Sequence, residues 1–160
     1  MPRKDPQDNV IARNRKAFHD YQILESFETG IALCGTEVKS CRMKSVSINE
    51  AYAKIDNGQL TLMDMNISPY ACGNRFNHEP DRQRKLLMKK KEILKLSSKT
   101  KEKGLTLIPL KLYLKKGLVK LELGLGKGKA FEDKRETLRK RQDDMDMRRA
   151  TGHKAKYGSD

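Results

Sequence analysis

Residues 105–125, LTLIPLKLYLKKGLVKLELGL, decide the fold that the sequence predicts. Leucines alternate with polar residues from 110 to 114, and apolar residues alternate again from 119 to 125. Such alternation is typical of strands with one buried face. The Lys116-Gly117 step between the two runs indicates a turn, although only the glycine readily tolerates a positive φ. The stretch therefore predicts an antiparallel hairpin, after which apolar alternation stops and basic residues take over.

The composition points to a polyanionic partner. The chain has 160 residues, of which 36% are hydrophobic, enough for one modest core. A formal net charge of +14 would repel itself unless a partner shares it, so nucleic acid is the first candidate and an anionic membrane surface the second. No apolar run approaches the roughly 20 residues that span a bilayer, and the N-terminal residues lack the apolar core of a secretory signal. We therefore expect a cytoplasmic protein without membrane contact.

The cysteines do not suggest a metal centre. Cys34, Cys41 and Cys72 cannot all pair within one chain, and together with His78 they offer none of the short ligand spacings of zinc sites. We expect reduced, structural thiols, with no metal and no cofactor.

Before the decisive stretch, the chain alternates turn signals with short apolar runs. Residues 1–16 indicate a flexible arm, strands are expected at 21–27 and 30–38, and 39–44 is expected to be loop-like or a single turn. Asp56-Asn57-Gly58 predicts a tight hairpin, and residues 81–103 predict a basic helix that ends at Gly104. This pattern favours a mainly β fold with added helices, a small antiparallel barrel of the oligonucleotide-binding type over residues 17–129.

Residues 130–160 form a separate charged tail. Phe131, Leu138 and Met145 recur every seven residues, which gives a stripe too thin to dock a helix, since docked helices show three to four apolar positions per two turns. We expect this basic tail to be disordered when free and helical on a partner.

Seven motifs in fixed order resemble the SmpB (small protein B) family. They are NRKAFHDY (14–21), ETG (28–30), GTEVKS (35–40) with Arg42, ISPY (67–70), RKLL (84–87) with Lys91 and Glu92, GLTLIPLKLY (104–113), and residues 126–135. The resemblance implies an oligonucleotide-binding-type barrel and a monomer that binds the tRNA-like domain of transfer-messenger RNA. It also implies a second partner, the ribosome, where the tail becomes helical in the empty mRNA channel near the small-subunit decoding region during ribosome rescue.

The resemblance assigns site residues in two groups. The RNA-binding group comprises Asn14, His19, Glu28, Lys39, Arg42, Arg84, Lys85, Leu87 and Lys89. The tail group comprises Gly126, Lys127, Gly128, Lys129, Asp133, Lys134 and Arg135, in which the glycines are interpreted as a swivel. Lys89 stands where some members have Asn, and Ala150-Thr151 departs from the family's apolar pair, so we assign those last two no role.

Several alternatives stay open at this point. A basic helix is often only a solvated face, Glu28 could accept from RNA or hold a nearby Arg, and His19 could stack on a base or simply pack. A general structured-RNA-binding or ribosome-associated barrel protein is the main rival hypothesis. An RNase is disfavoured, because nothing in the sequence brings two histidines to one phosphate.

Overall fold

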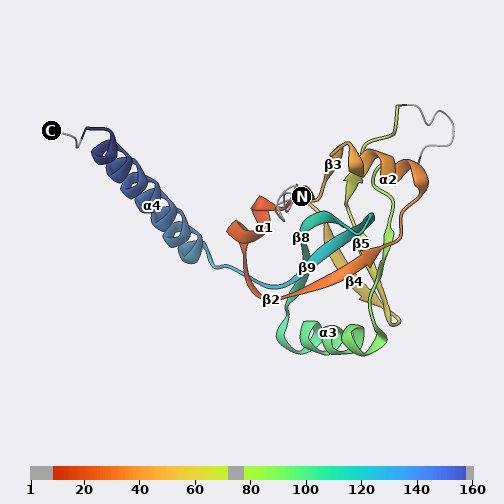
Figure 1. Ribbon diagram of the computed structural model, residues 1–160. Helices are drawn as coiled ribbons and strands as arrows, with labels where there is room; N and C mark the ends of the chain where they lie inside the picture. Colours follow the sequence, from red (N-terminus) through yellow and green to blue (C-terminus); the bar gives the residue numbers. More distant parts are fainter. Residues whose placement is uncertain (1–8, 72–77, 158–160) are drawn as a thin grey trace. The chain divides into compact units, whose positions relative to one another are not determined.

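The computed structural model describes residues 9–71 and 78–157, apart from the side chains of 102, 103, 131–133 and 152–157. The chain divides into two compact units, Met1–Gly128 and Lys129–Asp160. Within the described residues, nine strands and four helices follow one another (Figure 1): β1 (Val10–Arg13), α1 (Arg15–Asp20), β2 (Tyr21–Ile31), α2 (Gly35–Arg42), β3 (Val46–Ser47), β4 (Tyr52–Asp56), β5 (Gln59–Met63), β6 (Asn66–Ile67), β7 (Arg84–Leu87), α3 (Lys90–Lys103), β8 (Thr106–Lys115), β9 (Leu118–Gly128) and α4 (Phe131–Tyr157).

The first unit is built on a ring of antiparallel strands. The sheet runs β1-β8-β4-β5-β7-β2-β9, and β9 also pairs with β8, which closes the six strands from β8 to β9 into a ring and leaves β1 as an added strand at the edge of β8. The strand pairings differ in length. β8 and β9 pair along almost their whole length, whereas β4 pairs with β8 only at Ala53 and Leu107. The ring is therefore not a closed barrel. The mainly β fold with added helices is confirmed, and the oligonucleotide-binding type stays an interpretation.

The core fills the ring, and a second cluster lies behind β8. Leucines such as Leu62, Leu112 and Leu121 are fully buried inside, and each contributes roughly 1.5–3 kcal/mol through burial. Ile108 and Leu110 pack instead with Ala17 of α1. This part of β8 thus buries both faces, which explains why its apolar residues run together instead of alternating.

Both predicted hairpins are confirmed. Asn57 and Gly58 have φ values of 48° and 75°, and Lys116 and Gly117 have 51° and 76°. Positive φ at both central residues is the signature of the turn whose twist suits two-residue hairpins. Lys116 accepts the left-handed conformation, so the weaker turn signal produces the same geometry as Asn-Gly.

The predicted helix over 81–103 is wrong in its first third. Residues 84–87 form β7, and α3 begins only at Lys90, although it ends as expected before Gly104, whose φ of 59° makes it a left-handed cap. Arg84 and Leu86 are buried while Lys85 and Leu87 are exposed. Alternation between buried and exposed side chains is typical of a strand. The sequence does not show it here, because one of the two buried positions is an arginine.

Two further expectations are corrected. The strand expected at 30–38 does not form, because β2 ends at Ile31 and α2 occupies 35–42, including most of the segment expected to be loop-like. The arm expected at 1–16 is partly ordered, since β1 pairs with β8 and α1 begins at Arg15. Residues 1–8 and Cys72 lie outside the described residues.

The second unit contains α4, a single helix of 27 residues. Three apolar side chains in its described part are solvated, with Leu138 and Met145 about half exposed and Met147 72% exposed. The helix is the conformation expected for the bound tail, and disorder of the free tail stays a prediction. No helix in the described ranges is both long and apolar enough to cross a membrane.

Candidate nucleic-acid interface

The outer face of the β7-β2-β9-β8 row carries the two central residues of the RNA-binding group. Leu87 pairs with Gly30, Gly30 pairs with Lys120 on β9, and Lys120 pairs with Tyr113 on β8. Side chains two apart in a strand share a face, so Glu28 lies on the same outer surface as Gly30. We call this surface the outer face.

Glu28 is held in place by two donors. The Tyr113 hydroxyl donates to its carboxylate, and Lys115 Nζ lies 3.1 Å from Oε2. These hydrogen bonds, from Tyr113 first and then Lys115, hold the pKa of Glu28 below its usual value. The cation it holds is therefore a lysine and not the arginine considered above. An ionised carboxylate has about four acceptor positions, so Glu28 can still accept from a base amino group or a 2′-hydroxyl.

Leu87 is exposed because Gly30 leaves it room. Its side chain is 53% accessible, although it lies on a strand of the ring. A Cβ placed on Gly30 would lie 3.1 Å from the Cβ of Leu87, closer than most real contacts. Glycine at position 30 thus leaves room for the Leu87 side chain beside β2, two residues along the strand from Glu28.

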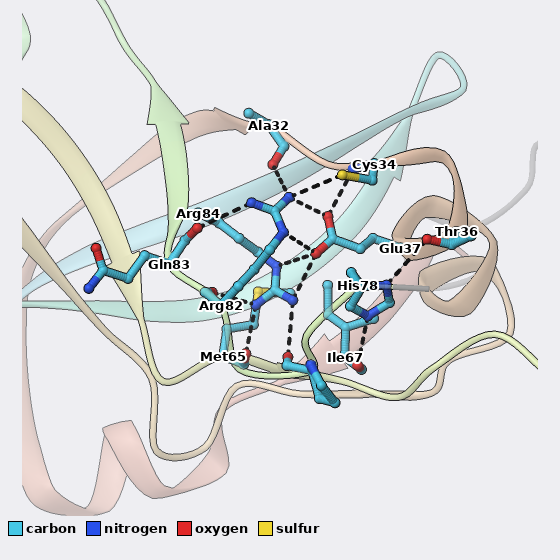
Figure 2. A network of polar contacts seen from close by, with 11 residues as sticks. Ala32, Cys34, Thr36, Glu37, Met65, Ile67, His78, Arg82, Gln83 and Arg84 are labelled. Carbon is cyan, nitrogen blue, oxygen red and sulfur yellow. Dashed lines mark hydrogen bonds and ion pairs between the residues drawn. The ribbon is translucent and has the colours of Figure 1, made fainter. Parts of the chain in front are cut away.

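Arg84 does not belong to the interface. Its side chain is fully buried, and its guanidinium donates to Glu37 Oε1 at 3.0 Å, to the Met65 carbonyl at 2.7 Å and to the Pro80 carbonyl at 3.0 Å (Figure 2). With its donors engaged inside the protein, Arg84 cannot contact RNA, so the sequence assignment is corrected.

Glu37 is the centre of this network, although it is not among the predicted site residues. Arg82 Nε lies 2.7 Å from Oε1 and Arg82 Nη2 lies 2.6 Å from Oε2, while the Cys34 backbone N–H donates to Oε2 at 2.8 Å. Burial alone would raise the pKa of Glu37, but hydrogen bonds from Arg82 and Cys34 and the charge of Arg84 lower it. Figure 2 shows both guanidinium groups converging on this one carboxylate. The network ties α2 to β7 on the buried side of that strand.

His78 ties the same region together. Its Nε2 lies 3.0 Å from the Ile67 carbonyl, which can only accept, so Nε2 carries the hydrogen. Nδ1 lies 3.3 Å from the Thr36 hydroxyl, within hydrogen-bond distance. Both ring nitrogens of His78 are thereby engaged in holding α2 against β6.

Asn14 is also corrected from an RNA-binding residue to a structural one. It is 1% exposed and accepts the Ala17 N–H at 3.0 Å, which caps α1. Its amide donates to the carbonyls of Ile48 and Pro109 at 3.1 and 3.0 Å. Asn14 therefore joins α1 to the ring, and its side chain is not available to RNA.

The other members of the RNA-binding group reach solvent. His19 is partly exposed, with Nδ1 2.9 Å from Asp20 Oδ1. Lys39 on α2 is exposed, with Nζ 5.3 Å from the centre of the Tyr70 ring, and Arg42 is exposed in the last turn of α2. Lys85 lies on the outer face of β7, and Lys89 is exposed just before α3.

Helix α3 presents lysines to solvent, as expected for a basic helix, and packs on the core through Ile93 and Leu96. Both are buried, whereas Leu94 is 64% exposed. Its exposed lysines include Lys90, Lys91, Lys95 and Lys101. An array of this kind is suited to a phosphate backbone.

The tail group is divided between the two units. Gly126, Lys127 and Gly128 lie in β9, paired with residues 21–23 of β2. A Cβ on Gly126 would lie 3.2 Å from both Tyr21 Cβ and Ile108 Cδ1, and its φ is not positive. The swivel interpretation is therefore wrong for Gly126, which is a packing glycine.

The other four tail residues lie in the second unit. Lys129 Nζ is 3.2 Å from Thr137 Oγ1, Lys134 and Arg135 reach solvent in the first turns of α4, and the side chain of Asp133 lies outside the described residues.

Comparison with known proteins identifies one family. Residues 11–153 match the family model described as SmpB protein. A protein named SsrA-binding protein from Carboxydothermus hydrogenoformans is 61% identical over 84% of this chain and 90% of its own length. Proteins with the same name from Geobacter sulfurreducens and Latilactobacillus sakei are 52% and 50% identical, over 93% and 94% of this chain and 97% of their own lengths.

A solved structure is also similar to this chain. A chain from the work described as "tmRNA-SmpB: a journey to the center of the bacterial ribosome" is 46% identical, with a TM-score of 0.64. The match covers 80% of this chain and 94% of that chain.

Proposed function

Because the chain belongs to the SmpB family, we propose that it binds the tRNA-like domain of transfer-messenger RNA through the outer face and acts in ribosome rescue. The observation that carries this proposal is that Glu28 and Leu87 are exposed on one face, with Leu87 paired with Gly30, two residues after Glu28 on β2. The names of its relatives, which bind SsrA RNA, and the solved tmRNA-SmpB structure support it.

The outer face suits a folded RNA read by shape. Lys85, Lys115 and Lys120 offer charge to phosphates around Glu28 and Leu87. A carboxylate repels phosphate, so Glu28 serves a donor such as a 2′-hydroxyl or a base amino group. Phosphate contacts supply affinity, and the Glu28–Leu87 pair supplies the preference for one RNA surface.

The second unit supplies the ribosomal half of the function. Lys134 and Arg135, at the start of α4, act in the decoding region, and α4 lies in the empty mRNA channel. The exposed Leu138, Met145 and Met147 support this role, because a helix whose described apolar side chains are not buried gains its stability from a partner. We further propose that the chain acts as a monomer in the cytoplasm and performs no catalysis itself.

Two variants test RNA binding by the outer face and ribosome rescue by the tail separately. Glu28→Ala should lower affinity for the tRNA-like domain, whereas Glu25→Ala, which removes another exposed carboxylate of β2, should not. Lys134→Ala combined with Arg135→Ala should leave RNA affinity nearly unchanged and abolish rescue in a translation assay with stalled ribosomes. Normal RNA affinity in Glu28→Ala would refute its assignment, and equal loss of RNA binding and rescue in the tail variant would refute the division of labour.

A further inference from the structure

A cleft of about 240 Å³ in the first unit is lined by α1, by the segment that leads into β4, and by β8. Glu28 and Leu87, the central residues of the outer face, do not line it. Tyr21 does line it, and Tyr21 pairs with Gly128, the last residue of the first unit. The cleft therefore lies beside the point where the chain leaves the first unit for the tail.

The cleft is preformed because the strand ring opens there and one buried side chain joins its walls. β4 and β8 share a single residue pair. Pro109 on β8 has no N–H to donate to β4, and its carbonyl accepts from the side chain of Asn14 instead. The same side chain accepts from the Ala17 N–H of α1 and donates to the carbonyl of Ile48, before β4. Asn14 thus holds all three walls in place without a ligand.

The lining combines buried aliphatic residues with aromatic rings. Ala17, Ala51 and Ile108 line the cleft and are buried, whereas Tyr21 is partly exposed and Tyr52 is 40% exposed. The volume is below the roughly 300–1,000 Å³ of sites for small molecules and cofactors. The cleft therefore suits one side chain of a partner better than a cofactor.

The charged groups of the cleft favour a cation. Asp20 and Glu50 line it, and Lys16 is the one cation among the described residues that do so. Lys16 Nζ lies 2.7 Å from Glu50 Oε1, so this lysine is already paired. One lysine against two carboxylates gives the lining a formal charge of −1, in a chain whose net charge is +14. A phosphate is therefore disfavoured in this cleft.

An arginine side chain matches each part of the lining. Its methylene stem can pack on the buried aliphatic residues, while its planar guanidinium can stack on a tyrosine ring and bind a carboxylate through two parallel hydrogen bonds. Asp20 is the more sheltered carboxylate, since its side chain is 24% exposed and that of Glu50 is 73% exposed. A carboxylate can accept about four hydrogen bonds, so the contact of Asp20 with His19 does not exclude a second partner.

We propose that this cleft receives an arginine side chain from a basic segment of a ribosomal protein. The inference rests on the proposed function, which brings the chain to the ribosome and places the tail in the decoding region. The cleft adjoins the start of that tail, so it faces the ribosome while the outer face holds the transfer-messenger RNA. Proteins that pack against RNA carry arginines and lysines for its phosphates, which makes a basic segment available there.

Crosslinking from the cleft identifies its occupant. A photoreactive amino acid replaces Asn49, an exposed residue of the lining, in the full chain bound to transfer-messenger RNA and stalled ribosomes. We expect a crosslink to an arginine-bearing segment of a ribosomal protein, mapped by mass spectrometry. The same photoreactive group at Gln59, which is exposed on β5 and does not line the cleft, should not reach that segment.

Affinity for stalled ribosomes tests the two carboxylates. Asp20→Asn combined with Glu50→Gln should weaken ribosome binding of the protein–RNA complex about tenfold and leave affinity for the tRNA-like domain unchanged. Asp56→Asn is the matched control, because it removes an exposed carboxylate of β4 outside the cleft, and it should bind like the unmodified protein. Tyr52→Phe, which keeps the ring, should bind better than Tyr52→Ser. Urea unfolding checks that each variant keeps the fold.

A double-mutant cycle tests direct contact. Replacing the crosslinked arginine by alanine should lower affinity by a factor similar to that of the two carboxylate changes, and combining all of them should lower it little further.

Three results would overturn the inference. They are a crosslink from position 49 to ribosomal RNA or to no arginine-bearing segment, ribosome affinity in the Asp20→Asn, Glu50→Gln variant equal to that in Asp56→Asn, and additive effects in the cycle. Failure of the proposed function is distinct, because the unmodified complex would then not bind stalled ribosomes at all. That result would overturn both.

Discussion

Replacing Glu37 by alanine should destabilise the fold without touching the outer face. Glu37 and Arg84 are both fully buried, and their side chains meet at 2.9 Å. Removing the carboxylate leaves the guanidinium of Arg84 buried without its counter-charge and leaves the Cys34 N–H without its acceptor. Breaking a buried pair from one side costs about 3–5 kcal/mol, a large share of the roughly 5–15 kcal/mol that stabilises a typical domain.

Urea unfolding followed by far-ultraviolet circular dichroism measures this loss, since the chain has no tryptophan. Glu25→Ala is the matched control, because its ion pair with Lys99 is exposed and should contribute no more than about 1 kcal/mol. Combining Glu37→Leu with Arg84→Met should recover most of the loss, since both buried charges are then gone. A loss in Glu37→Ala no larger than in Glu25→Ala would refute the structural role of the network.

The same network predicts acid lability. The pKa of Glu37 is lowered in the folded state, so its contribution is fully present above the unfolded value of about 4.3 and is lost as pH falls through the folded value. The free energy of unfolding should therefore fall more steeply below about pH 4.3 in the unmodified protein than in the Glu37→Leu, Arg84→Met variant. Parallel pH profiles would contradict the assignment.

Three further substitutions test the packing and charge of the outer face and its surroundings. Gly126→Val should cost about 1–3 kcal/mol in urea unfolding, because its side chain would press on Tyr21 and Ile108, whereas Gly128→Val, with no atom within 4 Å of its added Cβ, should cost less; equal costs would refute the packing role. Gly30→Val should displace Leu87 and lower affinity for the tRNA-like domain as much as Leu87→Ala does, with unchanged affinity as the contradicting result. Lys85→Ala should reduce the salt slope of RNA binding by about 0.7–0.9, and an unchanged slope would exclude a phosphate contact.

Local patterns in the sequence were sufficient for the hairpins. Alternation on both sides of Asn57-Gly58 and Lys116-Gly117 encodes strand pairs whose partners are adjacent in the chain. Gly104 ends α3 for an equally local reason, since a glycine readily adopts the left-handed cap.

Long-range partners explain what the sequence could not show. Arg84 looks like one more cation in a basic helix until Glu37, 47 residues earlier, is placed beside it. Glu37 itself accepts from the Cys34 N–H at the start of α2. Cys34 occupies the N-cap position, and cysteine is not among the usual N-cap residues, so the sequence does not indicate that a helix starts there.

The candidate site rests on the resemblance, which assigned Glu28, Lys85 and Leu87. The residues alone placed Lys85 and Leu87 in a helix, and their outward positions on a strand became visible only with β7. Asn14 has a polar side chain, which by itself suggests an exposed position. The two carbonyl groups that it donates to lie 34 and 95 residues away in the chain, so only the fold reveals that it is buried.

Competition binding across a salt series tests the central claim most directly. The full chain and a chain ending at Ala130 are titrated with the tRNA-like domain of transfer-messenger RNA, with an unrelated hairpin of equal charge as competitor. Salt weakens phosphate contacts but changes contacts such as those of Glu28 and Leu87 much less. We predict that both chains prefer the tRNA-like domain at every salt concentration. A preference that disappears with salt, or with removal of the tail, would show that the protein is a general basic RNA binder.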